Sequence, residues 1–293
     1  MRRQNIMAGF CLGLFLLLCA PAAWTQEVYC RYQIPTGIFY GQVEGETILE
    51  LDAAPWKNGQ PTGQEVPVEK VRLLHPSEPV KIIGLSGSYQ EAWPDSEPYN
   101  TVRWFLKPPT SAASPYEPVL LPDALDEVLV ETELTIIIGK RVKNANLAQA
   151  EEAIFGYTVA NDIVGSVTSY HENAGEPADQ PEPILPLGLK QGDGFAPYGP
   201  YIYRGVDWNN RQRTLRIIRP SGEEATYEHN TANLVYPPAK MVRDLSRVFV
   251  LEPGDVIMTG TTAALPARSG DRVIVGVEGL GTLENLIGLP SQQ

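Results

Sequence analysis

Two glutamates, Glu131 and Glu133, stand two positions apart in the stretch VLVETELTIIIGK, residues 128–140. The alternation of apolar and polar residues predicts a β-strand, on which residues two apart point to the same face. Two ionised carboxylates side by side repel each other. Exposure to water, protonation of one carboxylate or a bridging divalent cation would relieve that repulsion. The run of isoleucines at 136–138 predicts that the strand enters the core, which disfavours full exposure of both acids.

A third carboxylate, Asp162, follows Asn161 in the apolar stretch FGYTVANDIVG. We interpret this stretch as a second strand that carries Asp162 in its middle. Three carboxylates from two strands, completed by water, suit Mg²⁺ or Mn²⁺. Zinc is disfavoured, because no His or Cys accompanies the three acids. The alternative is that Asp162 only caps the following turn.

A lysine, Lys190, precedes the Gly- and Pro-rich loop QGDGFAPYGP. Beside an anionic metal site, its ammonium group could orient a substrate carboxylate or stabilise an oxyanion. The alternative is an ordinary solvated loop lysine.

The elements that must position these residues are mostly strands. The chain has 26 Gly and 26 Pro and little helical periodicity, which predicts a strand-rich, turn-rich fold of the mostly β (α+β) class. Residues 27–75 predict a small β-unit with a turn at 44–46, and strands dominate from residue 80 onward. Two helices are predicted, over 146–157 with Asn146 as its cap, and over 237–248 with Met241, Leu245 and Val248 on one face.

The charge of the chain argues against one class of partner. A formal net charge of −12 without a basic stripe disfavours nucleic acid binding.

The N-terminus predicts a secretory signal over residues 1–23. Two arginines precede an apolar run at 10–20 and then the small residues APAA. The run is short for a membrane span, so we expect export and no span in the mature chain. An uncleaved signal that anchors the protein, or a lipid on Cys19, is the alternative. Mature protein would keep only Cys30 and could form no internal disulfide, so its core must hold the fold.

From about residue 27 to 288 the chain resembles the fumarylacetoacetate hydrolase family, in the sense of the bacterial fumarylacetoacetase-like proteins. Any one of the shared motifs is weak, but seven occur in the family's order. They read FLKP, ETELTIIIGK, GYTVAND, KQGDGFAPYGP, NTANLVY, LEPGDVIMTGT and GLGTLENLIG.

The resemblance implies a mixed β-sandwich roll with a small N-terminal β-domain over 27–75 and a catalytic domain over 80–288. It also implies a homodimer, and a small 2-oxo or β-diketo acid as the substrate. Such acids are hydrolysed, decarboxylated, hydrated or isomerised by family members.

The same resemblance assigns roles to residues. Glu131, Glu133 and Asp162 would bind Mg²⁺, or Mn²⁺ or Ca²⁺ in its place. Lys190 would act in catalysis next to the metal, with Asp193 after it in the motif. Thr261 and Tyr89 would contact the substrate.

The sequence departs from the family pattern in three places. The family has a mobile lid whose His and Glu activate water, but in SYQEAWPD only Tyr89 fits, since Ala92 and Asp95 stand at the His and Glu positions. Ser166 stands where an Arg often follows the Asn-Asp pair, and Thr262 replaces a Pro.

Two main functions remain open. The first is a metal-dependent enzyme with an altered lid, whose base could be Glu91, Asp95, Lys190 or metal-bound water. The second is an exported, non-catalytic protein that binds metal and oxo acid. A purely structural exported domain would require the three acids to be incidental, and metal content would test that.

Overall fold

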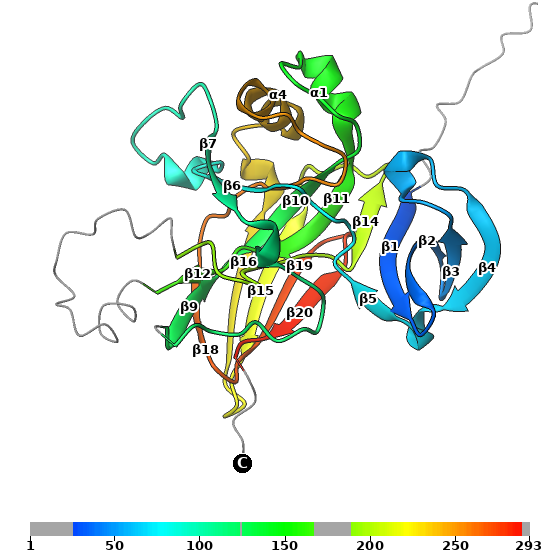
Figure 1. Ribbon diagram of the computed structural model, residues 1–293. Helices are drawn as coiled ribbons and strands as arrows, with labels where there is room; N and C mark the ends of the chain where they lie inside the picture. Colours follow the sequence, from blue (N-terminus) through cyan, green and yellow to red (C-terminus); the bar gives the residue numbers. More distant parts are fainter. Residues whose placement is uncertain (1–25, 124, 167–188, 289–293) are drawn as a thin grey trace, which may run out of the picture.

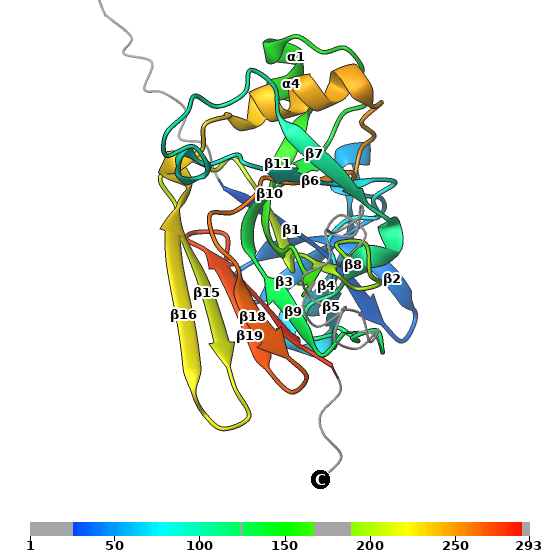
Figure 2. The ribbon, with the colours of Figure 1, turned by 90° about the vertical axis from the view of Figure 1, so that its left-hand side faces the viewer.

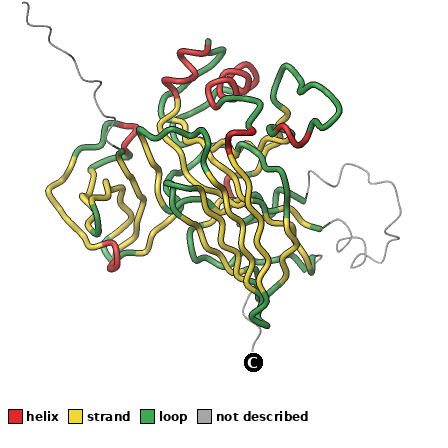
Figure 3. The backbone as a smooth tube through the Cα atoms, turned by 180° about the vertical axis from the view of Figure 1, so that it is seen from behind, coloured by secondary structure: helices red, strands yellow, loops and turns green. Residues whose placement is uncertain are grey.

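The structure is a computed structural model that describes residues 26–123, 125–166 and 189–288. The predicted signal segment, 1–23, lies outside the described residues. The fold is mostly β, as predicted, with two α-helices at one end of the strands in the described part of the chain (Figures 1 and 3). Within that part, no helix combines the length and the apolar character that crossing a bilayer requires.

One large, mostly antiparallel sheet runs through the molecule in the order β4-β3-β2-β1-β14-β11-β10-β17-β6-β7, with β5 paired to β1 and a parallel pair between β17 and β6. Its strands are β1 Glu27–Ile34, β2 Gly37–Glu44, β3 Thr47–Leu51, β4 Pro61–Pro67, β5 Arg72–Leu74, β6 Ile82–Ser86, β7 Arg103–Lys107, β10 Thr132–Ile138, β11 Ile154–Asn161, β14 Tyr201–Arg204 and β17 Val256–Met258.

The N-terminal strands form a group to one side of the main body (Figures 1 and 3). β2 and β3 pair around Gly45, whose φ of +62° suits glycine, so the turn predicted at 44–46 is confirmed. β1 pairs with β2 and β5, and also with β14 of the main body. The N-terminal strands are therefore joined to the rest by backbone hydrogen bonds.

A second sheet, in the order β16-β15-β19-β20, lies over part of the first (Figure 2). Apolar side chains between the two sheets form the main core, among them Leu134 and Ile136 from β10 and Leu215 from β15. The strands are β15 Gln212–Ile218, β16 Glu224–Asn230, β19 Arg272–Val277 and β20 Thr282–Leu286.

Two small sheets complete the fold. The first has the order β12-β9-β18, and the second pairs β13 with β8. Their strands are β8 Ala112–Ala113, β9 Glu127–Val130, β12 Val164–Gly165, β13 Ala196–Pro197 and β18 Leu265–Arg268.

The first helix is shorter than predicted. α1 spans Leu147–Ala153 and starts with a capping box between Asn146 and Gln149. β11 begins at Ile154, because the β-branched and aromatic residues that follow pair with β10 instead of continuing the helix.

The second helix ends at Val248, as predicted. α4 spans Pro238–Val248 and packs beside α1 (Figures 1 and 2). Met241 and Leu245 are buried as predicted, but Val248 is exposed. Its place in the last turn, where the helix ends, leaves it outside the core.

Candidate active site

The three predicted carboxylates meet at one point. One oxygen from each of Glu131, Glu133 and Asp162 lies within 4.8 Å of the other two, and this is the spacing of groups that can share one cation. Glu133 and Asp162 are fully buried, and Glu131 is partly buried.

The way in which the strands leave the main sheet explains this convergence. One continuous strand was predicted over 128–140, but the segment divides at Glu131 into β9 and β10. β10 pairs with β11 in the main sheet, whereas β9 pairs with β12 and β18 in a small sheet. The chain therefore bends at Glu131, because its two halves belong to different sheets.

The neighbouring segment makes the same change of sheet. Asp162 was predicted in the middle of a strand, but it follows the end of β11 and precedes β12. The Asp162 amide donates to the Glu131 carbonyl at 3.1 Å, and the Glu131 amide donates to Asn161 Oδ1 at 3.0 Å. These bonds hold the two junctions together and bring their acids to one place.

Glu133 has one engaged oxygen and one free oxygen. Its Oε2 accepts a hydrogen bond of 2.6 Å from the amide of Gly260, while its buried Oε1 has no hydrogen-bond partner in the described residues. Burial, followed by the charges of Asp162 and Glu131, raises the pKa of Glu133 well above its ordinary value. Burial and Asp162 raise the pKa of Glu131 to about 7.

Two lysines supply positive charge. Lys190 Nζ lies 2.6 Å from Asp162 Oδ2 and 3.3 Å from Glu131 Oε2. Burial lowers the pKa of Lys190, but the charges of Asp162 and Glu131 outweigh burial and leave it above the ordinary value. Lys190 is therefore an ammonium ion in this arrangement, and the structure places it beside the acids.

The second lysine, Lys107, was not predicted as a site residue. Its fully buried Nζ lies 2.7 Å from Asp162 Oδ1 and donates to the carbonyls of Ile163, Lys190 and Phe195 at 2.6–2.9 Å. Lys107 thus ties the carboxylate to the loop that carries Lys190. The motif FLKP contains it, but nothing in that motif gives its distant partners.

The donor set fits a hard divalent cation. Burial and mutual repulsion raise the pKa values of Glu131 and Glu133, so their ionised forms are disfavoured without a cation, and a divalent cation would stabilise them. The partnerless Oε1 of Glu133 offers a ligand atom, and oxygen ligands are those that Mg²⁺, Mn²⁺ and Ca²⁺ prefer.

Replacing Lys107 with methionine should destabilise the fold by about 3–5 kcal/mol, because Asp162 would keep a buried charge without this partner. Urea unfolding measures the change. Lys140→Met is a matched control, since Lys140 is exposed and its ion pair with Glu152 should contribute at most about 1 kcal/mol. Equal losses in the two variants would contradict a special role for Lys107.

The residues predicted to contact substrate lie near the acids. Gly260, which binds Glu133, directly precedes the half-buried Thr261. Tyr89 is fully buried and is surrounded by charged groups, among them Arg213 and Glu133. Burial raises the pKa of Tyr89 to about 12, so its hydroxyl remains protonated. Asp193 is exposed.

The segment that aligns with the family's lid is held by an aromatic cluster. Trp93 is buried, donates its indole N–H to the Gly87 carbonyl at 2.8 Å, and packs edge-on against Tyr99. Ala92 and Asp95, on either side of Trp93, are exposed. Glu91, another candidate base, accepts a hydrogen bond from Asn233.

Two further polar residues come from the second sheet, and sequence reasoning missed both. Arg213 on β15 and His229 on β16 are direct cross-strand partners and are both buried. His229 Nδ1 is hydrogen-bonded to the hydroxyl of Thr262, one of the positions that depart from the family pattern. The polar-apolar alternation of RTLRII could have indicated that Arg213 faces the same side as Leu215.

His229 should make the fold sensitive to acid. Burial and then Arg213 lower its pKa to about 3, against about 6.5 in an unfolded chain. Between these values the unfolded chain binds a proton that the folded protein does not, so stability falls as pH decreases. We expect His229→Gln to reduce this fall, measured by urea unfolding at pH 7 and pH 4.5. The same fall in both proteins would contradict it.

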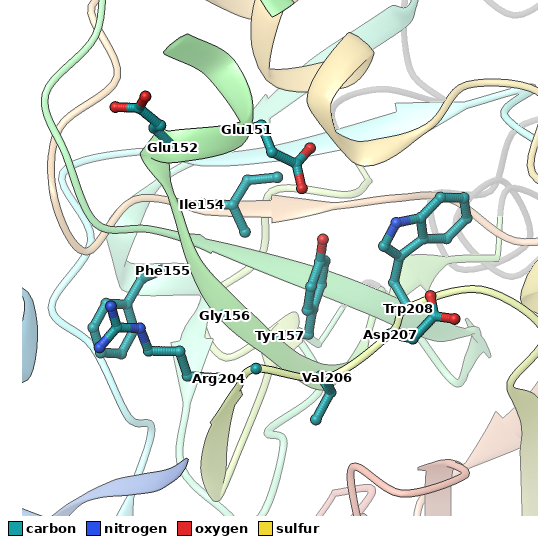
Figure 4. A pocket seen from close by; sticks show the side chains of 11 residues that line it. Glu151, Glu152, Ile154, Phe155, Gly156, Tyr157, Arg204, Val206, Asp207 and Trp208 are labelled. Atoms are coloured by element: carbon teal, nitrogen blue, oxygen red, sulfur yellow. The ribbon is translucent and has the colours of Figure 1, made fainter. Parts of the chain in front are cut away.

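A separate hollow of about 710 Å³ lies at the opposite end of β11 from Asp162. Figure 4 shows Tyr157, Trp208 and Glu151 around it. None of the predicted site residues lines this hollow, so the converging carboxylates are the better candidate for chemistry.

Comparisons with known proteins cover both parts of the chain. The family described as "Fumarylacetoacetate (FAA) hydrolase C-terminal" matches residues 79–287, and "Rv2993c-like, N-terminal" matches residues 29–76. Protein Rv2993c of Mycobacterium tuberculosis is 30% identical over 266 residues, which cover 87% of this chain and 96% of that protein.

Two further similarities concern proteins named for an activity. A structure of 5-carboxymethyl-2-hydroxymuconate delta-isomerase from Mycobacterium smegmatis superposes with a TM-score of 0.76 at 30% identity, covering 89% of this chain and 99% of that one. The homoprotocatechuate catabolism bifunctional isomerase/decarboxylase of Escherichia coli is 30% identical over 216 residues, which are 73% of this chain but only 48% of that protein.

Proposed function

Because the chain belongs to the fumarylacetoacetate hydrolase family, we propose that it is a divalent-metal-dependent enzyme acting on a small 2-oxo or β-diketo acid. The observation that carries this proposal is the convergence of Glu131, Glu133 and Asp162 next to Lys190. Mg²⁺ is our first choice of cofactor, with Mn²⁺ or Ca²⁺ as alternatives.

In this proposal Glu131, Glu133 and Asp162 would hold the cation, which would supply Lewis acidity to the substrate. Lys190 places a positive charge beside Asp162 and Glu131, where it can stabilise an oxyanion of the substrate. Tyr89 and Thr261 orient the substrate, and the buried Tyr89 hydroxyl can donate a hydrogen bond to it. Lys107 acts indirectly, since it holds Asp162 and the Lys190 loop in place.

Isomerisation, decarboxylation or hydration suits this chain better than hydrolysis of a C–C bond. Alanine at position 92 cannot carry a proton, so hydrolysis that depends on a lid His-Glu pair lacks one of its groups. The similar proteins of E. coli and M. smegmatis are named as an isomerase/decarboxylase and an isomerase, which supports the same choice.

The alternative function is a non-catalytic protein that binds metal and oxo acid. Exposure of Ala92 and Asp95, on a segment held by buried Trp93, favours it. Both functions need the metal site, so turnover separates them.

The deciding experiment screens the purified mature protein against 2-oxo and β-diketo acids, oxaloacetate and acylpyruvates included, with Mg²⁺ or with EDTA. Turnover that EDTA removes and that Lys190→Met lowers supports the enzyme. Metal binding and oxo-acid binding without turnover would establish the alternative. A protein that binds no divalent metal would refute both.

We also propose that residues 1–23 direct export and that the mature protein is a homodimer. N-terminal sequencing should find a start near Ala23 on material outside the cytoplasm. Intact Met1 on cytosolic protein would refute cleavage. Light scattering of the mature protein should give twice the mass of one chain.

A further inference from the structure

Arg213 is an arginine in the core of the protein, and it has no counter-ion among the described residues. Arg213 is 0% exposed, and no carboxylate of the described residues forms an ion pair with it. One nitrogen, Nη1, donates to the carbonyls of Thr132 and Gly260 at 3.0 and 3.1 Å. The other two nitrogens, Nε and Nη2, are buried and have no hydrogen-bond partner there.

The two free nitrogens belong to the same edge of the guanidinium group. Carboxylates bind that edge with two parallel N–H···O bonds, which are among the stronger hydrogen bonds in proteins. Buried charges without partners are costly, and buried polar groups in native proteins are almost always paired. A buried edge with two unused donors therefore indicates a place for an anionic ligand.

The surroundings of Arg213 restrict what that ligand can be. The Tyr89 ring covers one face of the guanidinium group, with 4.2 Å between Cζ and the ring centroid. His229 is the cross-strand partner, and its low pKa leaves it neutral at pH 7. A planar anion that meets the free edge fits this setting, because the guanidinium charge attracts it and neither Tyr89 nor the neutral His229 carries a negative charge.

The arginine is also close to the metal-binding carboxylates. Gly260 accepts from Arg213 through its carbonyl and donates to Glu133 through its amide, at 3.1 and 2.6 Å. One residue thus separates the guanidinium group from Glu133. The cation position therefore lies near Arg213, on the far side of Gly260.

We infer that Arg213 binds a second carboxylate of the substrate, the one that does not meet the metal, and so selects oxo dicarboxylic acids over oxo monocarboxylic acids. This inference rests on the proposed function. Arg213 is a specificity residue in this scheme and moves no proton.

A purely structural role is the competing explanation. Through Nη1 alone, Arg213 joins β10 to the turn at Gly260, and this would suffice to keep it. The structural role predicts that a substitution weakens both kinds of oxo acid equally, whereas the binding role predicts a change in preference.

The experiment measures binding of 2-oxoglutarate and 2-oxobutanoate to the full mature protein by calorimetry at saturating Mn²⁺. The wild type should bind the dicarboxylate roughly ten- to a hundredfold more tightly, as expected for hydrogen bonds to a charged group. Arg213→Met should remove this preference by weakening the dicarboxylate selectively, because loss of the Nη1 bonds to Thr132 and Gly260 would affect both acids alike. Arg213→Lys keeps the charge but loses the two parallel N–H donors, so it should retain part of the preference. This variant replaces Arg213→Met as the test if the methionine variant does not fold.

Arg216→Met is the matched control, because Arg216 lies on the same strand but is exposed and pairs with Glu224. It should behave as the wild type. A preference that survives in Arg213→Met and Arg213→Lys, or an equal loss for both acids, overturns the inference and leaves the proposed function intact. Failure of both acids to bind the manganese-loaded wild type overturns the proposed function, and the inference with it.

Discussion

Replacing Glu133 with glutamine should make the metal-free protein more stable and remove the stabilisation that a divalent cation gives. Glutamine keeps an oxygen that can accept from the Gly260 amide, but it has no charge. Repulsion from Asp162 and Glu131 and the cost of burying the charge would both disappear in the metal-free state.

The same change removes a metal ligand. Loss of an outer-shell partner already lowers metal affinity about 10- to 100-fold, so we expect the loss here to exceed about 100-fold. At a Mn²⁺ concentration 100 times the dissociation constant, the wild type should gain about 2.7 kcal/mol of stability, and the variant should gain almost nothing. Thermal unfolding with Mn²⁺ or EDTA measures both effects.

Glu127→Gln is the control for this comparison. Glu127 lies on β9, close in sequence to Glu131, but its side chain pairs with Arg268 and takes no part in the acidic cluster. It should show the wild-type response to Mn²⁺. Equal Mn²⁺ affinity in Glu133→Gln and wild type would refute the metal site.

The second large expected effect is an increase in turnover. Ala92→His combined with Asp95→Glu should raise metal-dependent hydrolysis or decarboxylation of an acylpyruvate or oxaloacetate. A positioned general base contributes about 10²–10⁴-fold, and even an imperfectly placed pair should give a measurable increase. Both positions are exposed, so neither substitution disturbs the core.

The control is Ala92→Gln with Asp95→Glu. Its side chain at position 92 is similar in size to histidine but has no imidazole to carry a proton, so we expect no gain in turnover. Lys190→Met in the double variant should remove the gain. Pro94 and the buried Trp93 lie between the two positions and fix the shape of the segment. If wild-type turnover is already fast and the double substitution leaves it unchanged, another group does the work of the missing pair.

Local sequence patterns predicted much of the fold. Alternation and turn residues gave the mostly β class and the β2–β3 turn, because both depend on neighbours in sequence. The same reasoning extended the first helix past Ala153, where pairing of β11 with β10 outweighs helix propensity. Long-range pairing decides such boundaries and leaves little trace in a short window.

The candidate site likewise has residues that could be predicted from the sequence and residues that could not. Glu131, Glu133, Asp162 and Lys190 could be predicted, since their types and motifs indicate the chemistry. The bend at Glu131 could not, because it depends on which sheet each half of the segment joins. Lys107 and Arg213 gain their roles only from carbonyl and carboxylate groups far away in the sequence.

The pairing of β1 with β14 has a consequence for how the protein can be divided. Glu27 to Cys30 cover the edge of β14, a strand that on its other side pairs with β11, which leads to Asp162. Deleting the N-terminal strands would leave that edge bare, with unpaired amides and carbonyls that other chains can bind. Aggregation, rather than a minimal working enzyme, is the expected result of such a truncation, so the N-terminal strands also serve as a protective cover for the sheet that carries the site.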